Sequence, residues 1–335
     1  MGEVVEAGSL EGVASTTLKK LHKAGLVTLE SIAVTPPRQI VELTGMGADT
    51  AIKVNALARL KVDPGFVSAQ DMLEMRSHMM RCRTGSNELN RILGGGVETG
   101  VITELIGEFA SGKTQICYTL SVLAQRPVEE GGFGGRVCVI DTEGTFLPER
   151  ISQIAKARGY DPDEILRNIF IARAYNSEHQ IILIKNLPQV CQEHDVKLVI
   201  VDSMIGHFRG EYIGRATLAE RQQKLGNALG NLLRIAEAFS LAVVLTNQVQ
   251  AKPDAAYGDP NRPTGGHVMA HACTHRVYLR KGRANTRLVR VIDSPYLPEE
   301  KVRIAITLAG VTDEDGSFPS SDDEGEEAKP RLEEE

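Results

Sequence analysis

The sequence predicts an α/β fold, in which a mostly parallel central sheet with an antiparallel edge follows a small all-α domain. Short apolar runs rich in β-branched residues alternate with helical patterns within residues 81–312. These runs lie at 100–106, 137–141, 168–173, 197–202, 241–246, 275–280, 287–293 and 302–307. Continuously apolar strands that alternate with helices are typical of a sheet covered on both faces. The last three runs follow one another through short turns, so we expect that edge of the sheet to be antiparallel.

Composition divides the chain into four parts. Residues 1–61 contain short helical patterns broken by glycines, which predicts a small helical domain. Residues 62–80 have the composition of a linker that leads into a helix, and residues 81–312 form the α/β core. Residues 313–335 are acidic and poor in apolar side chains, so we expect a disordered tail there.

Two helices of the core have recognisable patterns. Apolar residues recur at spacings of three, four and seven from Leu218 to Phe239, which predicts one long amphipathic helix. Pro188 falls inside the helical pattern of residues 179–194. We expect it to kink or split that helix, because proline has no N–H group and its ring clashes with the preceding turn.

The bulk composition is that of an intracellular globular protein. Apolar residues make up 42% and charged residues 24% of the 335 residues. The sequence contains no apolar run near the roughly 20 residues of a membrane span and no signal-peptide pattern, so we expect a cytoplasmic protein. The five cysteines form no C-x-x-C pair, and we interpret them as buried thiols in a reducing compartment.

The net charge of −6 does not exclude an anionic partner. Residues 313–335 contain 11 acidic and 2 basic side chains, which leaves 36 of the 38 basic and 33 of the 44 acidic residues in the rest of the chain. The body of the protein is therefore slightly basic, and the overall sign is set by the tail.

A phosphate-binding motif lies near the start of the core. Gly107, Gly112, Lys113 and Thr114 form the pattern G-x-x-x-x-G-K-T between an expected strand and an expected helix. Backbone N–H groups converge on a phosphate in such a loop, the lysine supplies a positive charge, and the threonine hydroxyl reaches Mg²⁺. Asp202 ends the apolar run KLVIVD and can hold the metal shell through water. We therefore expect ATP and Mg²⁺ to bind.

Two further strand ends indicate hydrolysis rather than binding alone. Glu143 follows the strand in VIDTEGTF, where a carboxylate can orient a water molecule for in-line attack. Gln248 ends the strand in LAVVLTNQ, where an amide can bond to the γ-phosphate or to the attacking water. The chain then enters the segment 249–266, and a sensor joined directly to such a loop can report which nucleotide is bound.

Two loops combine basic and aromatic side chains. Basic groups bind phosphates and aromatic rings stack on bases, a combination typical of proteins that bind single-stranded nucleic acid. A few arginines alone usually form a solvated face, but these loops follow the strands that end in Asp202 and Gln248. The residues are Phe208, Arg209, Tyr212, Arg215, Arg221 and Lys224 in the first loop, and Lys252, Tyr257 and Arg262 in the second.

These segments together resemble the archaeal RadA recombinases, a family of RecA-type strand-exchange ATPases. The resemblance extends from about residue 8 to residue 312 and is carried by GEFASGKTQ, VIDTEGTF, HFRGEYIGRATLAERQQKL, TNQVQAKPD, DPNRPTGGHVMAHACTHRVYLRKG and IDSPYLPE. It implies a RecA-type ATPase core, an N-terminal helix–hairpin–helix domain and a nucleoid-associated protein. It also implies helical filaments on single-stranded DNA, with ATP at each subunit interface, that pair with homologous double-stranded DNA and exchange strands in recombination and repair.

The resemblance assigns roles to matching residues. Lys113, Glu143 and Gln248 would be catalytic, with Glu143 polarising the water and Gln248 sensing the γ-phosphate, and Thr114 and Asp202 would hold Mg²⁺. The nucleotide-binding set is Gly107, Glu108, Phe109, Ala110, Ser111, Gly112, Lys113, Thr114, Gln115, Arg150 against the adenine, and His271, Asp293 and Pro298 towards the ATP of a neighbouring subunit. The DNA-binding set is Arg209, Tyr212, Arg215, Arg221, Lys252, Tyr257 and Arg262.

Phe66 and Ala69 match the F-x-x-A polymerisation element of the family. The resemblance implies that Phe66 fills an apolar pocket on the next subunit, near residues 172–174, and heterologous contacts of this kind build filaments. Composition leaves open that Phe66 packs against its own domain. Residues 10–25 and 43–54 resemble two hairpin units that present N–H groups to a phosphate backbone, and a helical bundle whose glycines only turn the chain is the alternative.

The chain departs from the family pattern at several positions. Ala110 replaces a glycine of the phosphate loop, Leu147 stands where an arginine is common, and Ile205 and Gly206 replace small hydroxyl residues. None of these changes removes a phosphate or metal ligand, so we expect activity, with a reduced hydrolysis rate as one possibility.

Other interpretations of the sequence remain open. His267, His271 and His275 have helical spacing, but His275 lies in an expected strand, so we interpret these histidines as metal-free. The alternative functions are a recombinase paralogue that acts as a mediator without efficient strand exchange, and another P-loop enzyme such as a hexameric helicase or a small-molecule kinase.

Overall fold

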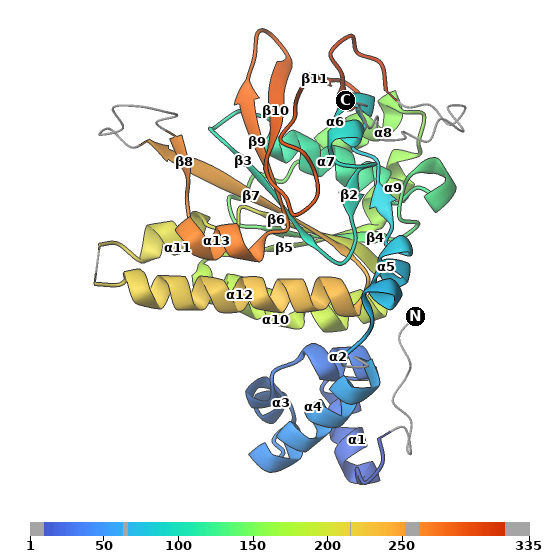
Figure 1. The fold of residues 1–335 in the computed structure, drawn as a ribbon, viewed down its shortest axis with the longest axis vertical. Helices are drawn as coiled ribbons and strands as arrows, with labels where there is room; N and C mark the ends of the chain where they lie inside the picture. Colours follow the sequence, from blue (N-terminus) through green and yellow to red (C-terminus); the bar gives the residue numbers. More distant parts are fainter. Residues whose placement is uncertain (1–9, 63–65, 215, 252–260, 319–335) are drawn as a thin grey trace.

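The structure is a computed structural model that describes residues 10–62, 66–214, 216–251 and 261–318 (Figure 1). Its centre is a ten-stranded sheet in the order β12-β11-β10-β9-β3-β7-β6-β4-β5, with β8 paired to β7. These strands are β3 (Ile102–Gly107), β4 (Arg136–Asp141), β5 (Ile169–Arg173), β6 (Val196–Asp202), β7 (Ala242–Ala251), β8 (Asn261–Pro263), β9 (His275–Lys281), β10 (Thr286–Asp293), β11 (Lys301–Thr307) and β12 (Gly310–Asp313). A separate antiparallel pair is formed by β1 (Arg81–Cys82) and β2 (Val97–Glu98).

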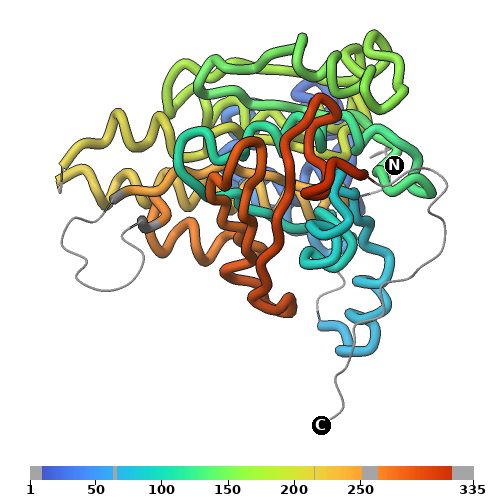
Figure 2. Tube along the Cα trace, turned by 90° about the horizontal axis from the view of Figure 1, so that it is seen from above, coloured from blue at the N-terminus to red at the C-terminus, as the bar shows by residue number. Residues whose placement is uncertain are grey.

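The large sheet is parallel from β5 to β9 and antiparallel beyond β9. The pairs β5–β4, β4–β6, β6–β7, β7–β3 and β3–β9 are parallel, whereas β9–β10, β10–β11 and β11–β12 are antiparallel. β12 and β5 are the two edge strands in this order, and the view from above shows the red C-terminal strands next to the orange ones that precede them (Figure 2). The predicted α/β fold with an antiparallel edge is confirmed.

Helices cover both faces of the sheet because successive side chains of a strand point to opposite faces. Val199 and Val201 of β6 pack in the apolar core that includes α10 (Ser177–His194) and α12 (Leu218–Ala238). Leu198 and Ile200 of the same strand pack in a second core with α7 (Lys113–Leu123). The other helical segments of this region are α6 (Asn87–Ile92), η1 (Val128–Glu130), α8 (Pro148–Ala157), α9 (Pro162–Arg167), α11 (Gly206–Glu211) and α13 (Gly266–Ala272).

The N-terminal helices have an apolar core of their own. They are α1 (Ser15–Lys23), α2 (Leu29–Val34), α3 (Pro37–Thr44) and α4 (Ala48–Val62), and their core includes Leu21, Ile32, Ile40 and Val54. The Asn55 amide donates to the carbonyl oxygens of Ile32, Ala33 and Thr35 at 2.8, 3.1 and 2.9 Å. It thereby satisfies carbonyls that the end of α2 leaves without partners inside the helix.

The turn at Gly25 faces the ATPase core. Gly25 has φ 78°, and a Cβ there would lie 3.1 Å from Cδ of Gln189 in α10. Gln39 of α3 also contacts α10, because its amide donates to the Lys185 carbonyl at 3.4 Å. The end of the first predicted hairpin unit, at Gly25, is therefore next to α10.

Helix α5 (Ala69–Ser77) connects the helical unit to the core. Ser68 and Asp71 cap its first turn, with Asp71 N–H donating to Ser68 Oγ at 3.1 Å. Every residue of α5 is described and none of them is buried. Phe66 just before it is 108% exposed, so within the described chain the structure contradicts the alternative that Phe66 packs against its own domain.

Two sequence expectations are corrected by the fold. Pro188 does not split its helix: α10 continues from Ser177 to His194 with Pro188 buried inside it. The predicted tail begins within the fold, because Asp313 ends β12 and its carboxylate accepts from Ser86 Oγ at 2.5 Å and from the backbone N–H of Glu88 at 3.1 Å. The long helix predicted at residues 218–239 is confirmed as α12. Throughout the described segments, each helix is too short or too polar to traverse a lipid bilayer.

Candidate nucleotide-binding and DNA-binding site

The phosphate loop connects β3 to α7, as the motif requires. A Cβ on Gly107 would lie 2.5 Å from the Leu279 carbonyl oxygen, and Gly112 has φ 105°, so both positions need glycine. Ala110 adopts φ 60°. This left-handed conformation costs an alanine only about 1 kcal/mol relative to glycine. A cost of this size is small enough for the loop to accept alanine in place of glycine.

Lys113 lies over the phosphate loop at the start of α7. Its ammonium group donates to the carbonyl oxygens of Gly107 at 2.9 Å and Glu108 at 2.8 Å. Burial lowers the pKa of Lys113, and the negative charges of Asp202 and Glu143 only partly oppose this effect. The negative charge of a bound phosphate would further favour the protonated form of this ammonium group.

Thr114 and Asp202 meet at the end of β6. The Thr114 hydroxyl donates to Asp202 Oδ2 at 2.7 Å, and the Thr246 hydroxyl donates to Oδ1 at 2.5 Å. Burial raises the pKa of Asp202, and these two hydrogen bonds partly offset the increase. A hydroxyl and a buried carboxylate side by side are the oxygen ligands that Mg²⁺ prefers, so the residues present fit this ion.

Glu143 and Gln248 are brought together at the same edge of the sheet. Glu143 follows β4, whereas Gln248 belongs to β7 and pairs with Gly107 in the parallel register. The Gln248 amide donates to Glu143 Oε1 at 3.1 Å. The predicted catalytic carboxylate and the predicted sensor are therefore in direct contact, beside the phosphate loop.

Asp141 holds the segment that carries Glu143, a role that sequence reasoning missed. Its carboxylate, 5% exposed, accepts hydrogen bonds from the backbone N–H groups of residues 143–146 at 2.8 to 3.4 Å. Tyr118 adds to this support by donating to the Thr145 carbonyl at 2.7 Å, and burial raises the pKa of Tyr118 to about 12. The only available signal was the position of Asp141 at the end of a strand, like that of Asp202.

The segments after β4 and β6 are joined to each other. Thr142 N–H donates to the Asp202 carbonyl at 2.9 Å, and Ser203 N–H donates to Thr142 Oγ1 at 2.8 Å. The Asp202–Ser203 peptide bond is cis. These contacts link the metal-site residue to the segment that presents Glu143.

Arg150 bridges α8, α7 and the turn between β11 and β12. It donates to Gln115 Oε1 at 2.9 Å and to the carbonyl oxygens of Thr307 at 2.5 Å and Leu308 at 3.1 Å. Burial lowers its pKa. Gln115 directly follows the phosphate-loop motif, so its hydrogen bond with Arg150 fixes Arg150 beside that loop. Leu147, in place of the arginine common in the family, is 55% exposed beside this helix.

The strand register places residues 293–298 away from the phosphate loop of the same chain. Asp293 pairs with Arg276, which pairs with Glu104, whereas the loop follows Gly107 at the other end of β3. Beyond Asp293 the chain continues past the start of β9, so it moves further from Gly107. His271 of α13 lies just before the start of β9 and stacks on His267 at 5.9 Å. Asp293 and Pro298 are therefore not placed to contact the phosphate loop of their own chain, and their role towards a neighbouring subunit, like that of His271, stays a prediction.

The first loop is described in part. Arg209 is exposed on α11, and the Tyr212 ring stacks on Phe208 at 6.5 Å. Lys224 donates to the Tyr212 hydroxyl at 2.7 Å and pairs with Glu178 and Glu220. Its charge is therefore neutralised by the protein, which reduces its value for holding phosphates. Arg215 lies outside the described residues, as do Lys252 and Tyr257 of the second loop and the side chain of Arg262.

A buried carboxylate that the sequence did not indicate holds the base of the second loop. Glu104, 0% exposed, accepts from the Asn247 amide at 2.6 Å and from Arg276 Nε at 2.7 Å. The Asn247 amide also donates to the Thr264 carbonyl at 2.7 Å, where the loop returns. Glu104 was hidden in the sequence because it lies in the otherwise apolar strand ITELI.

A family model described as Rad51 matches residues 75–314. The chain belongs to the Rad51 family. It is also 47% identical over 311 residues to the DNA repair and recombination protein RadA of Aeropyrum pernix, an alignment that covers 93% of this chain and 98% of that protein. Membership in the Rad51 family confirms the predicted RecA-type fold and the prediction of a recombinase that works in DNA repair and recombination.

Proposed function

We propose that this chain is an ATP-dependent recombinase that forms helical filaments on single-stranded DNA and exchanges strands with a homologous double-stranded DNA. The observation that carries the proposal is the contact of Gln248 with Glu143 at the phosphate-loop edge of the sheet. Gln248 lies in the strand that leads into the second loop, so a group near the γ-phosphate is covalently continuous with a DNA-binding segment. ATP binding and DNA binding would thereby be coupled.

The site residues divide the hydrolysis reaction among them. Lys113 would hold the phosphates, and Thr114 and Asp202 would hold Mg²⁺, which neutralises charge that develops on the phosphate oxygens when it is bound. Glu143 would accept a hydrogen bond from the attacking water and orient it. Gln248, which donates to Glu143 at 3.1 Å, would exchange that bond for one to the γ-phosphate or the water. The chemistry is that of a DNA-dependent ATPase.

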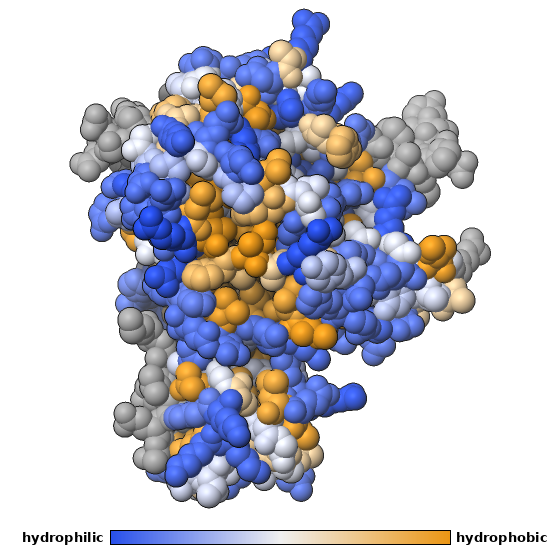
Figure 3. All heavy atoms as spheres, turned by 180° about the vertical axis from the view of Figure 1, so that it is seen from behind, coloured by the Kyte–Doolittle hydropathy of each residue, from blue (hydrophilic) through white to orange (hydrophobic). Residues whose placement is uncertain are grey.

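Assembly would use two surfaces on opposite sides of the subunit. Phe66 is fully exposed before α5, and β5 is the edge strand of the sheet, with Ile171 47% and Tyr175 70% exposed. The β4–β5 edge lies at the back of the view in Figure 1, and the space-filling view from behind shows apolar side chains gathered on that face (Figure 3). An exposed aromatic residue that fits a different surface of the next copy makes a heterologous contact, and such contacts propagate into filaments.

DNA would bind along the two loops. Arg209 and Arg221 flank the first loop, and the slightly basic body of the chain favours a polyanion. Arg215, Lys252, Tyr257 and Arg262 complete the proposed set.

We also propose that residues 1–61 act as a helix–hairpin–helix domain and residues 62–80 as the polymerisation linker, in a nucleoid-associated protein. Within that domain the Lys53 ammonium group donates to the Gly12 carbonyl at 3.1 Å, so one of its hydrogen bonds is made to the turn of the first hairpin unit.

Electron microscopy with single-stranded DNA and a non-hydrolysable ATP analogue tests the proposal. We expect continuous helical filaments, and we expect ATP turnover in solution to rise when single-stranded DNA is added. Discrete closed rings or free monomers under these conditions, together with turnover that does not respond to DNA, would contradict the proposal. The Phe66→Ala variant should give short soluble species without filaments.

A further inference from the structure

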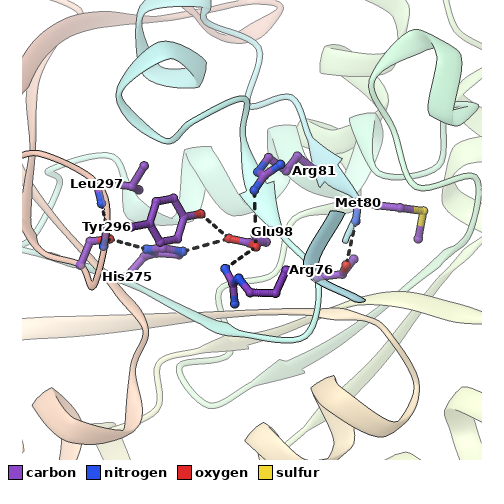
Figure 4. A network of polar contacts seen from close by, with 9 residues as sticks. Arg76, Met80, Arg81, Glu98, His275, Tyr296 and Leu297 are labelled. Carbon is purple, nitrogen blue, oxygen red and sulfur yellow. Dashed lines mark hydrogen bonds and ion pairs between the residues drawn. The ribbon is translucent and has the colours of Figure 1, made fainter. Parts of the chain in front are cut away.

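A second buried carboxylate, Glu98, collects polar side chains from distant parts of the chain (Figure 4). It is 1% exposed and lies in β2. Glu98 Oε1 accepts from Arg76 at 3.1 Å and lies 3.5 Å from Arg81 Nη2. Glu98 Oε2 accepts from the Tyr296 hydroxyl and lies 3.3 Å from His275 Nε2.

The partners keep this carboxylate ionised. Burial by itself raises the pKa of Glu98, but hydrogen bonds from His275 and Tyr296 and the charges of Arg81 and Arg76 outweigh it, so the pKa is lowered. A buried carboxylate is stable only when its oxygens have such partners. Removing one partner therefore loosens the segment that supplied it.

Glu98 connects two segments, α5 and the 294–298 loop, to which the proposed function gives different roles. Arg76 belongs to α5, the helix that begins at the polymerisation residue Ala69. Tyr296 belongs to the loop of residues 294–298, and the Arg76 guanidinium lies 5.7 Å from the centre of the Tyr296 ring. The Glu98 carboxylate therefore holds both α5 and the 294–298 loop.

The loop itself is built so that its outer side stays available. Ser294 Oγ accepts from the Leu297 N–H at 3.0 Å and lies 3.1 Å from His275 Nδ1, which is stacked edge-on against Tyr296. Asp293, Pro295 and Pro298 are exposed. The Tyr296 hydroxyl and the buried His275 ring anchor the loop on Glu98, while the Tyr296 ring is 46% exposed and the outer residues remain in solvent.

We propose that Glu98 is a positioning residue that fixes the 294–298 loop and α5 as one unit, so that the loop is preorganised to meet the ATP of the neighbouring subunit only when α5 is seated. This inference rests on the proposed function, since it takes the loop and Phe66 to act across a subunit interface. Glu98, Tyr296, His275, Arg76 and Arg81 would not touch the nucleotide. They would act by holding the residues that do.

The test compares Tyr296→Phe and Arg76→Gln with the unchanged chain in steady-state ATP turnover on saturating single-stranded DNA. Tyr296→Phe keeps the ring and removes the hydroxyl that Glu98 receives. A hydrogen bond to a charged group is strong enough that its loss should raise the KM for ATP about tenfold, with kcat changed less than about twofold. The double variant should show no larger KM than the single variant with the larger effect, because both changes break one unit.

Two controls separate positioning from folding. Arg290→Gln removes an exposed ion pair between β10 and Glu299, just outside the 294–298 loop, and should leave KM unchanged. In the Phe66→Ala background, where subunits do not assemble, Tyr296→Phe should leave the Kd for a fluorescent ATP analogue unchanged. Unfolding midpoints of all variants are measured alongside, and a KM change in a variant with an unchanged midpoint reports positioning.

Several results would overturn the inference. These are an unchanged KM for Tyr296→Phe, an unchanged KM for Arg76→Gln, strictly additive effects in the double variant, or an equal loss of analogue binding in the Phe66→Ala background. Failure of the proposed function would look different, because the unchanged chain itself would then form no filaments and show no DNA-stimulated turnover.

Discussion

The amide of Gln248 lies 3.1 Å from Oε1 of Glu143, and the two residues come from strands that β6 separates. The contact joins the group that would orient the attacking water to the strand that continues into the proposed second DNA-binding loop. An amide has one carbonyl and two N–H groups, so Gln248 can bond to a phosphate oxygen when it releases Glu143. A change of nucleotide can thereby alter the position of the loop.

We predict that Gln248→Ala removes the stimulation of ATP turnover by single-stranded DNA. Without the amide, the loop has no link to the γ-phosphate, whereas the phosphate loop is unchanged. Turnover on DNA should fall about 100-fold or more, and nucleotide binding should change little. Turnover with and without DNA measures this, and a variant that keeps full stimulation would contradict it.

Glu143→Gln should separate ATP binding from hydrolysis. The glutamine has nearly the same shape but cannot act as a base or carry a charge, so kcat should fall by a factor of about 10² to 10⁴. Filaments should still form, and should persist with ATP as they do with a non-hydrolysable analogue. Electron microscopy at fixed times after ATP addition checks this, and filaments that disassemble at the normal rate would contradict it.

Asp202→Asn should stabilise the nucleotide-free protein at neutral pH while it abolishes the effect of Mg²⁺. Burial holds the folded-state pKa of Asp202 above the ordinary value of 3.8. The contribution of this group to stability is therefore complete below that value and is lost as pH rises through the folded-state pKa. Asparagine carries no charge to bury, so the unfolding midpoint should rise at pH 7.

The measurement is thermal unfolding with and without Mg²⁺ and ATP. The unchanged protein should gain stability from the pair, because a ligand that binds the folded state raises the midpoint. Asp202→Asn should gain much less. The prediction is contradicted if, at pH 7 without ligands, Asp202→Asn unfolds at a lower midpoint than the unchanged protein. That result would show that the carboxylate stabilises the fold.

Glu104→Ala should be severely destabilising. The change leaves Arg276 without its 2.7 Å partner and removes the acceptor of the Asn247 amide in a fully buried site. Breaking a buried ion pair in this way costs about 3 to 5 kcal/mol. Urea unfolding measures the loss. Glu299→Ala, which breaks the exposed pair with Arg290, should cost less than about 1 kcal/mol, and equal losses in the two variants would contradict the account.

Phe66→Ala should prevent assembly without affecting the fold. The side chain is 108% exposed, so its truncation leaves no cavity in the subunit. Size-exclusion chromatography should show short species, with an unfolding midpoint unchanged from the parent. Leu60→Ala is the matched control, since Leu60 is also exposed, at 75%, but lies in α4 outside the F-x-x-A element. Loss of assembly in both variants would argue against a specific role for Phe66.

Local patterns predicted much of the fold and of the candidate site, because the strands are continuous apolar runs and the candidate residues lie near their ends. Thr114 lies in the first turn of α7, Asp202 ends β6 and Glu143 follows β4, as expected. The expected strand end at Gln248 is wrong, because β7 continues to Ala251. Their convergence follows from the parallel sheet, in which carboxyl ends of strands share one edge.

The buried charges could not be predicted in the same way. Glu98 and Glu104 are paired with Arg76, Arg81 and Arg276, which lie at sequence separations that no local pattern connects. Lys224 shows the reverse case: the sequence places it among the basic and aromatic residues of the first loop, but it pairs with Glu178 from a distant segment and with Glu220 one turn earlier in α12. Pro188 is buried inside α10, so its local preference did not decide where that helix ends.

The affinity for single-stranded DNA in the presence of ATP or of ADP tests the central claim most directly. Fluorescence anisotropy with a labelled oligonucleotide measures it at one salt concentration, for the unchanged protein and for Gln248→Ala. We predict that the unchanged protein binds the oligonucleotide at least about tenfold more tightly with ATP than with ADP, and that Gln248→Ala binds equally with both. Equal affinities for the unchanged protein would contradict the coupling of the nucleotide to the DNA loops.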